Sequence, residues 1–267
     1  MVALRGGLGN QLFGWAYGES QRANGARVRF DANPQFGRGL AVPALIGKGD
    51  SLRVSPRIWR AASRGHLSWI PRFELVTEES SARVPERGSG LPALRLHLGY
   101  WQSLDYFAHC EGDIRARLIE RIGLVLRAQE DYCAVHVRRG DYISDPGAAA
   151  TLGALDADYY REAIDHMHAR GIHKFRVFTD DPEWATQNIV PISSGIEVSP
   201  AGSMMTDFAG IAMGASVIMA NSSFSWWGAF LNDRPTRPVV APQRWFRDSD
   251  LNSERLVPDR WIKIGTQ

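Results

Sequence analysis

The second half of the chain alternates between short apolar runs and longer stretches in which apolar residues recur at helical spacing. The runs, each ended by polar or glycine-rich residues, predict strands at residues 132–137, 175–178, 217–220 and 238–242. Between them, two helical stripes are formed by Tyr160, Ala163, Ile164 and Met167, and by Phe208, Ile211, Ala212 and Ala215. Strands that alternate with helices predict an α/β fold with a mainly parallel sheet.

The first half begins in a similar way and then loses its regularity. A strand at 2–4, a glycine-rich turn at 6–11, a helix ended by Asn24-Gly25 and a strand at 27–31 are predicted. Prolines and glycines interrupt residues 33–95, for which we expect short helices and long loops. A helix over about 111–127 follows. We therefore expect two α/β units, residues 1–130 and residues 131–267.

Composition narrows the class of protein. The 267 residues include 31 Lys and Arg against 29 Asp and Glu, a balance that argues against a protein that coats nucleic acid. The two cysteines, Cys110 and Cys133, exclude a disulfide framework and a cysteine-based zinc site. No signal peptide and no apolar run of about 18 residues is apparent. We expect a cytoplasmic protein without a transmembrane segment, and leave open peripheral contact at the inner face of the plasma membrane.

Polar side chains follow four of the predicted strands. Because ligands of doubly wound sheets bind at the carboxyl ends of the strands, these loops are the candidate site. They comprise residues 6–11, 136–141, 179–181 and 221–225.

The loop after the strand at 132–137 points to anion binding. On a strand, His136 and Arg138 share one face and Arg139 lies on the other. A guanidinium suits a diphosphate because its planar donors bind two oxygens and stay charged. The alternative is an Arg139–Asp141 pair that braces a turn.

Two further loops carry groups that could bind other parts of a nucleotide. Residues 221–225 place small polar side chains before a helix, where backbone N–H groups can bind an anion, although an ordinary serine N-cap is the alternative. Asp180 or Asp181 can accept hydrogen bonds from a base edge or a ribose. Alternatively, Asp181 caps the helix that Pro182 begins.

Other classes of function remain as alternatives. Gly7, Gly9 and Asp31 partly match a dinucleotide fingerprint, but Leu12 stands in place of its third glycine, so an NAD or FAD oxidoreductase is less well supported. A non-catalytic sugar-binding module would use exposed tryptophans. Two D-x-D pairs, Asp156/Asp158 and Asp248/Asp250, have spacing suited to a metal, but neither follows an apolar strand, so we expect no metal site.

The chain resembles glycosyltransferase family 11, the α-1,2-fucosyltransferases. The motifs that carry the resemblance are GGLGNQLF at 6–13, GYWQS at 99–103, HVRRGDY at 136–142, FTDD at 178–181 and NSSFSWWGAF at 221–230. Shorter matches occur at 106–107, 241–242, 245–246 and 261–263, and the blocks follow family order over most of the chain.

The resemblance implies a GT-B-type fold, in which two Rossmann-like units with mainly parallel sheets enclose a cleft. It implies that residues 1–130 form the acceptor-side unit and that residues 131–267 form the unit that binds the nucleotide sugar. It implies a GDP-β-L-fucose donor and inversion to an α-fucoside, with no metal or other cofactor. The acceptor would be the 2-hydroxyl of a galactose-terminated oligosaccharide or glycolipid. The catalytic candidates are Arg138, which would hold the diphosphate, and Asp141, a base or a brace for the arginines. The candidates for donor contact are Gly7, Gly9, Asn10, His136, Arg139, Asp180, Asp181, Asn221, Ser222, Ser223 and Phe224. The candidates for acceptor contact are Tyr100, Trp101 and Gln102.

Overall fold

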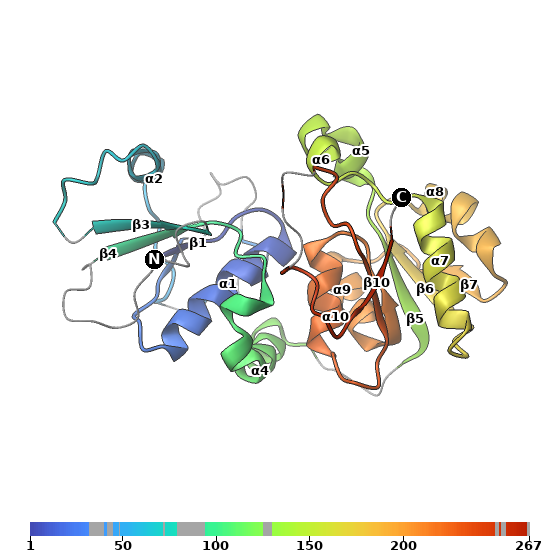
Figure 1. Ribbon diagram of the computed structural model, residues 1–267. Coiled ribbons are helices and arrows are strands. Elements are labelled where there is room, and N and C mark those ends of the chain that lie inside the picture. The colour runs from blue at the N-terminus through green and yellow to red at the C-terminus, as the bar shows by residue number, and fades with distance from the viewer. Residues whose placement is uncertain are drawn as a thin grey trace. The chain divides into compact units, whose positions relative to one another are not determined.

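The chain folds into two compact units, Met1–Gly123 and Leu124–Gln267, which divide a few residues before the predicted boundary after residue 130. The computed structural model describes residues 1–31, 40–41, 45–47, 49–71, 73–78, 94–124, 130–248, 251 and 255–265. Each unit contains one sheet with helices beside it (Figure 1). The assignment of acceptor and donor to the two units stays a prediction.

Unit 1 contains a four-stranded parallel sheet in the order β2-β1-β4-β3. Its strands are β1 (Val2–Ala3), β2 (Phe30–Asp31), β3 (Phe73–Thr77) and β4 (Leu94–Leu98). Its helices are α1 (Leu8–Ala23), α2 (Pro56–Ser63) and α4 (Glu111–Ile122). Short 3₁₀ turns occupy Leu104–Tyr106 and Ala108–Cys110.

Two expectations for unit 1 need correction. The region from 33 to 95 contains strand β3 and the start of β4 as well as the expected short helix, because Leu94, Leu96 and Leu98 alternate with polar residues and pair in parallel with β3. Helix α4 ends at Ile122 rather than near 127, because Gly123 adopts a left-handed φ of 64° that terminates the helix.

Unit 2 contains a six-stranded parallel sheet in the order β10-β9-β8-β5-β6-β7. Its strands are β5 (Glu130–Val137), β6 (Phe175–Thr179), β7 (Ile196–Val198), β8 (Gly214–Ile218), β9 (Val239–Pro242) and β10 (Ile262–Ile264). Its helices are α5 (Gly140–Ser144), α6 (Pro146–Thr151), α7 (Ala157–His168), α8 (Pro182–Asn188), α9 (Met204–Met213) and α10 (Ser223–Leu231). A 3₁₀ turn lies at Val190–Ile192. The predicted fold class, two α/β units with parallel sheets as in GT-B-type enzymes, is confirmed.

Helices cover the sheet of unit 2 on both faces (Figure 1). The predicted stripe of α7 is buried against the apolar residues of β5 and β6, such as Val135 and Val177. Helices α9 and α10 pack together in unit 2, where Gly228 lies so close to Ile211 that an added Cβ would approach it to 2.6 Å. Ala215 was expected on the apolar stripe of α9 but belongs to β8, because the helix ends at Met213 and the backbone becomes extended at Gly214. Strands β7 and β10 were not expected.

Among the described residues, no helix is both long enough and apolar enough to span a bilayer.

Candidate active site

The candidate site of unit 2 lies where β5, β6 and β8 end. Arg138 and Arg139 follow β5, Asp180 follows β6, and Ser222 precedes α10. All three strands are parallel neighbours, so their carboxyl ends meet at one edge of the sheet, as the sequence predicted.

Two carboxylates hold Arg138. Its Nε donates to Oδ1 of Asp141 at 3.0 Å, its Nη2 lies 2.7 Å from the same oxygen, and its Nη1 lies 2.9 Å from Oδ2 of Asp180. A guanidinium carries five N–H donors. One of them donates to Asp141, and the two further ion-pair contacts hold the guanidinium in one orientation. Arg138 retains 28% exposure, so an anion can reach it.

Asp180 also fixes the loop that carries the arginines. Its Oδ1 accepts from the backbone N–H of Arg139 at 2.8 Å, and its Oδ2 accepts from that of Gly140 at 3.2 Å. A Cβ at Gly140 would lie 2.8 Å from the same carboxylate, so a larger residue there would displace the Asp180 side chain. Asp180 thus has an internal role in addition to the nucleotide contact predicted for it.

The side chain of Arg139 points to the opposite side from that of Arg138, as strand alternation predicted. Its Nε lies 3.2 Å from Oδ2 of Asp181, and its guanidinium stacks 4.1 Å from the ring centroid of Trp184. Asp181 caps α8 by accepting from the N–H of Trp184 at 3.1 Å, which confirms the predicted cap. The alternative Arg139–Asp141 pair is wrong, because Asp141 pairs with Arg138 one residue earlier.

Tyr142 connects the arginine to the start of α10. The Arg138 guanidinium lies 5.8 Å from the centroid of the Tyr142 ring, and the Tyr142 hydroxyl donates to the carbonyl of Asn221 at 3.0 Å. Ser222 caps α10 by accepting from the N–H of Phe224 at 3.3 Å, which confirms an ordinary cap. Anion binding at this helix start stays a prediction, as do the donor contacts of Asn221, Ser222, Ser223 and Phe224.

His136 is buried beside this cluster. Its ring centroid lies 5.5 Å from that of Phe224, and Tyr160 donates to its carbonyl at 3.1 Å. Its Nδ1 is buried without a hydrogen-bond partner among the described residues. Burial, reinforced by the nearby charge of Arg138, lowers the pKa of His136 to about 3, so the imidazole is neutral at physiological pH.

In unit 1, the glycine-rich turn forms the start of α1. Gly6 has a φ of 70°, and Gly7 is the N-cap. Asn10 accepts from the Gln102 side chain at 2.6 Å, so two predicted site residues are brought together. Gln11 is buried and donates to the carbonyl of Gly6 at 2.9 Å, which fixes the turn.

Of the candidate acceptor residues, Tyr100 and Trp101 differ in exposure. Tyr100 is 39% exposed and lies 5.2 Å from the Arg5 guanidinium. Trp101 is fully buried, and its ring stacks on Tyr17 with centroids 3.9 Å apart. The Trp101 ring therefore faces the core of unit 1 and, in this arrangement, does not offer the predicted acceptor contact.

The residues behind the alternative functions have structural roles. Asp31 is fully buried and accepts from the indole of Trp59 and the N–H of Val54, so its carboxylate is not presented to a dinucleotide ribose. Asp156 caps α7. Asp158 lies 3.8 Å from Arg161. The second D-x-D pair extends outside the described residues, because Asp250 is not among them.

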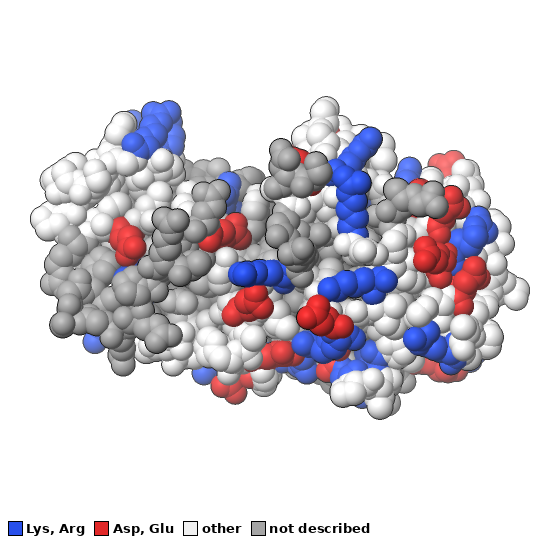
Figure 2. Space-filling model, viewed as in Figure 1, with Lys and Arg blue, Asp and Glu red and all other residues white. Residues whose placement is uncertain are grey.

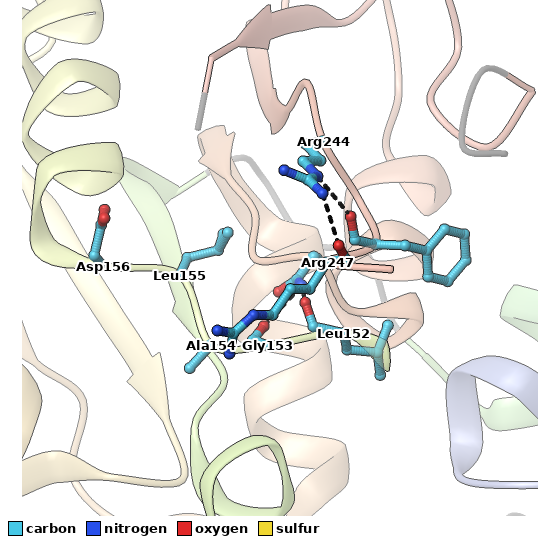
Figure 3. A pocket seen from close by; sticks show the side chains of 9 residues that line it. Leu152, Gly153, Ala154, Leu155, Asp156, Arg244 and Arg247 are labelled. Atoms are coloured by element: carbon cyan, nitrogen blue, oxygen red, sulfur yellow. Dashed lines mark hydrogen bonds between the residues drawn. The ribbon is translucent and has the colours of Figure 1, made fainter. Parts of the chain in front are cut away.

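A cavity of about 300 Å³ adjoins Asn221, between the segment before α7 and the loop after β9 (Figure 3). In it, Arg244 donates to the carbonyls of Phe246 and Arg247 at 3.1 and 2.7 Å. A second cavity of about 450 Å³ includes Arg139, Tyr142 and Trp184 in its lining, and Arg247 lines both cavities. These cavities reach two residues of the predicted donor set, Asn221 and Arg139.

Sequence reasoning missed Tyr142 and Trp184 as parts of the site. Tyr142 lies four residues after Arg138, a spacing that brings side chains together once a helix begins. Trp184 lies in the first turn of α8, directly after the Asp181 cap. Asp181 and Pro182 predicted the helix, but nothing in the sequence pattern indicated that Arg139 would stack on the ring of Trp184.

The chain is similar in sequence to known glycosyltransferases. The sequence model of Glycosyl transferase family 11 matches residues 86–265. An alpha-1,2-colitosyltransferase of Escherichia coli is 28% identical over 290 aligned residues, which cover 99% of this chain and 98% of the relative. A galactoside alpha-(1,2)-fucosyltransferase 1 of Saimiri sciureus is 30% identical over 163 residues, covering 53% of this chain and 44% of that protein.

A solved structure of E. coli heptosyltransferase WaaC with ADP covers 98% of this chain and 92% of its own, with a TM-score of 0.48 and 14% identity. That similarity is low, and the fold class rests on the strand pairing of the two sheets instead.

Proposed function

Because the chain belongs to glycosyl transferase family 11, we propose that it transfers L-fucose from GDP-β-L-fucose to the 2-hydroxyl of a terminal galactose. The product is an α-1,2-fucosylated glycan, and the reaction inverts the anomeric configuration. The observation that carries the proposal is Arg138, held by Asp141 and Asp180 near the start of α10.

The transfer requires stabilisation of a leaving nucleotide diphosphate. As the acceptor hydroxyl attacks the anomeric carbon, the fucose–phosphate bond breaks, negative charge grows on the β-phosphate of the departing GDP, and the hydroxyl proton is released to that phosphate or to water. The guanidinium of Arg138 is held in place and partly exposed, and the start of α10 supplies a positive helix end. Groups that are already oriented stabilise the transition state without a reorganisation cost at the moment of reaction.

The same geometry supports the proposed donor-side contacts. His136, neutral and buried beside Phe224, can hydrogen-bond the nucleotide without adding charge. Ser223 and Phe224 belong to the first turn of α10, where backbone N–H groups face an anion. In unit 1, Asn10 and Gln102 form a hydrogen-bonded pair that can contact a sugar hydroxyl.

No metal is needed in this scheme, since arginine and the helix end provide the positive charge. We therefore expect full transfer in the presence of a chelator. A strict requirement for Mn²⁺ or Mg²⁺ would contradict this part of the proposal.

A second donor is supported by one comparison. The relative that aligns over 99% of the chain is named for transfer of colitose, a deoxygenated relative of fucose. Colitosyl transfer from GDP-colitose is therefore the alternative activity, with the same leaving group and the same role for Arg138.

The test is incubation with GDP-fucose or GDP-colitose and a panel of galactosides, with and without EDTA. Mass spectrometry reports the transfer, and NMR of the product reports the linkage and anomer. The proposal predicts an α-1,2-fucoside in both conditions. Transfer from GDP-colitose alone would establish the alternative donor, and absence of transfer from either donor would contradict both.

A further inference from the structure

A strongly basic segment lies in unit 1, far in sequence from the predicted donor site. Residues 51–71, here named the basic segment, contain four arginines and no acidic residue. The chain has 29 acidic residues in 267, so a stretch of this length would contain about two on average. The charge of the segment is therefore concentrated and of one sign.

One side of the basic segment is fixed to the sheet of unit 1. Val54, Trp59 and Ala62 are buried and form a cluster with Ala3 and Leu96. The indole of Trp59 also donates to Asp31 at the end of β2. Packing and this hydrogen bond determine which side of α2 faces outward.

The outward side carries apolar side chains that nothing in the described residues covers. Leu52 is 42% exposed, Ile58 is 45% exposed and Trp69 is 76% exposed. They are three of the eight large hydrophobic residues that are exposed in the described part of the chain. Trp69 follows α2 within consecutive turns, in which the N–H of Ser68 donates to Gly65 and that of Ile70 donates to Leu67.

The arginines lie between these apolar residues and are unneutralised. All four are exposed, and within the described residues their guanidinium groups make no ion pair and no hydrogen bond; they are Arg53, Arg57, Arg60 and Arg64. In Figure 2, basic side chains stand over the position of α2 beside uncharged surface. The surface thus combines unpaired positive charge with exposed aliphatic and indole groups.

We propose that the basic segment docks unit 1 onto an anionic lipid surface. Lipid phosphates match the unpaired guanidinium groups, and each basic residue near such a surface contributes about fivefold to binding. Trp69 has the amphipathic ring that favours the interface, and Leu52 and Ile58 can enter the acyl boundary. A nucleic acid would satisfy the arginines but would leave these two aliphatic side chains in water. The proposal does not depend on which sugar the enzyme transfers.

The test is co-sedimentation of the full chain with vesicles of phosphatidylcholine alone or mixed with an equal amount of phosphatidylglycerol. We expect binding only to the anionic vesicles, weakened when salt rises from about 0.05 to about 0.5 M. The variant Arg57→Gln/Arg60→Gln should bind roughly 10- to 30-fold more weakly. Trp69→Ala should bind about tenfold more weakly.

The matched control is Arg161→Gln/Arg170→Gln, which removes two exposed arginines from α7 and the residues after it. It should bind vesicles like the unmodified chain, and thermal unfolding checks that every variant is folded. Equal binding to both vesicle types would overturn the proposal, and so would an equal loss in the control. Binding that Trp69→Ala leaves unchanged and that an oligonucleotide displaces would establish general polyanion attraction and also overturn it.

Discussion

At the scale of single residues, the arrangement around Arg138 separates two roles for Asp141. The carboxylate was predicted to act either as a base toward the acceptor hydroxyl or as a brace. Its Oδ1 accepts a hydrogen bond from Nε of Arg138 at 3.0 Å and lies 2.7 Å from Nη2 of the same guanidinium. This geometry supports the brace, in which Asp141 acts through the arginine and is a positioning residue.

For Asp141→Asn we expect kcat and GDP affinity to fall together, each by about tenfold, because a charge-assisted hydrogen bond is weakened while an amide oxygen still accepts. Steady-state kinetics and calorimetric titration with GDP measure the two quantities. A loss of kcat beyond about 10²-fold with unchanged GDP affinity would instead identify Asp141 as the base.

The placement of a side chain was predictable where it depends on strand alternation or on helix capping. Alternation placed His136 and Arg138 on one face and Arg139 on the other, and the structure confirms this through Phe224 and Trp184. The pairing of Asp141 with Arg138 was not predictable, because it depends on a helix that begins at Gly140. That helix was not indicated by an apolar stripe.

At the scale of elements, Arg237 holds the ends of two helices. It is almost fully buried and donates to carbonyls at the end of α9, near the end of α10 and at Gly214; the acceptors are Ile211, Ala212, Ala229 and Gly214, at 2.8–3.2 Å. Burial lowers the pKa of Arg237 to about 10, yet leaves it charged at neutral pH. A positive charge at helix C-termini offsets their negative ends.

Arg237→Met should therefore destabilise unit 2 by about 3 kcal/mol or more, because several buried carbonyls lose their donor. The measurement is urea unfolding followed by circular dichroism. The exposed Arg234→Met, in the same loop, is the control and should change stability by less than about 0.5 kcal/mol. Similar stability of the two variants would show that the buried guanidinium is not a major support.

Helices and strands were predictable where the spacing of apolar residues and the residues typical of element ends indicate the same element. The stripe of α7, and α8 with Asp181-Pro182, are found as expected, and Asp156 is found to cap α7. Strands β3 and β4 were missed because the many prolines and glycines between 33 and 95 obscured two short alternating runs. Strand β7 has only three residues, too few for a period to be recognised.

At the scale of the whole molecule, each unit buries one neutral histidine. Burial lowers the pKa of His97 and of His136 to about 3, against about 6.5 for an exposed imidazole. In unit 1, Nδ1 of His97 lies 2.9 Å from the Tyr17 hydroxyl. Between pH 6.5 and 3 the unfolded chain binds protons at these positions and the folded chain does not. Stability is therefore full above pH 6.5 and falls as the pH decreases toward 3.

We expect the melting temperature to decrease on acidification from about pH 7 to about pH 4, with a shallower dependence in His97→Gln and in His136→Gln. Differential scanning calorimetry measures the slope for each protein, so a uniform loss of stability in a variant does not affect the comparison. Parallel curves for the variants and the unmodified chain would show that these imidazoles do not control acid unfolding.

The account depends on Arg138 stabilising the leaving diphosphate with its oriented guanidinium. Arg138→Lys retains the charge but loses the planar fork that Asp141 and Asp180 hold. The decisive measurement is kcat with GDP-fucose for this variant, beside its dissociation constant for GDP. We expect a loss of about 10²- to 10³-fold in kcat with at most about tenfold weaker GDP binding. A kcat within a few-fold of the unmodified enzyme would contradict it.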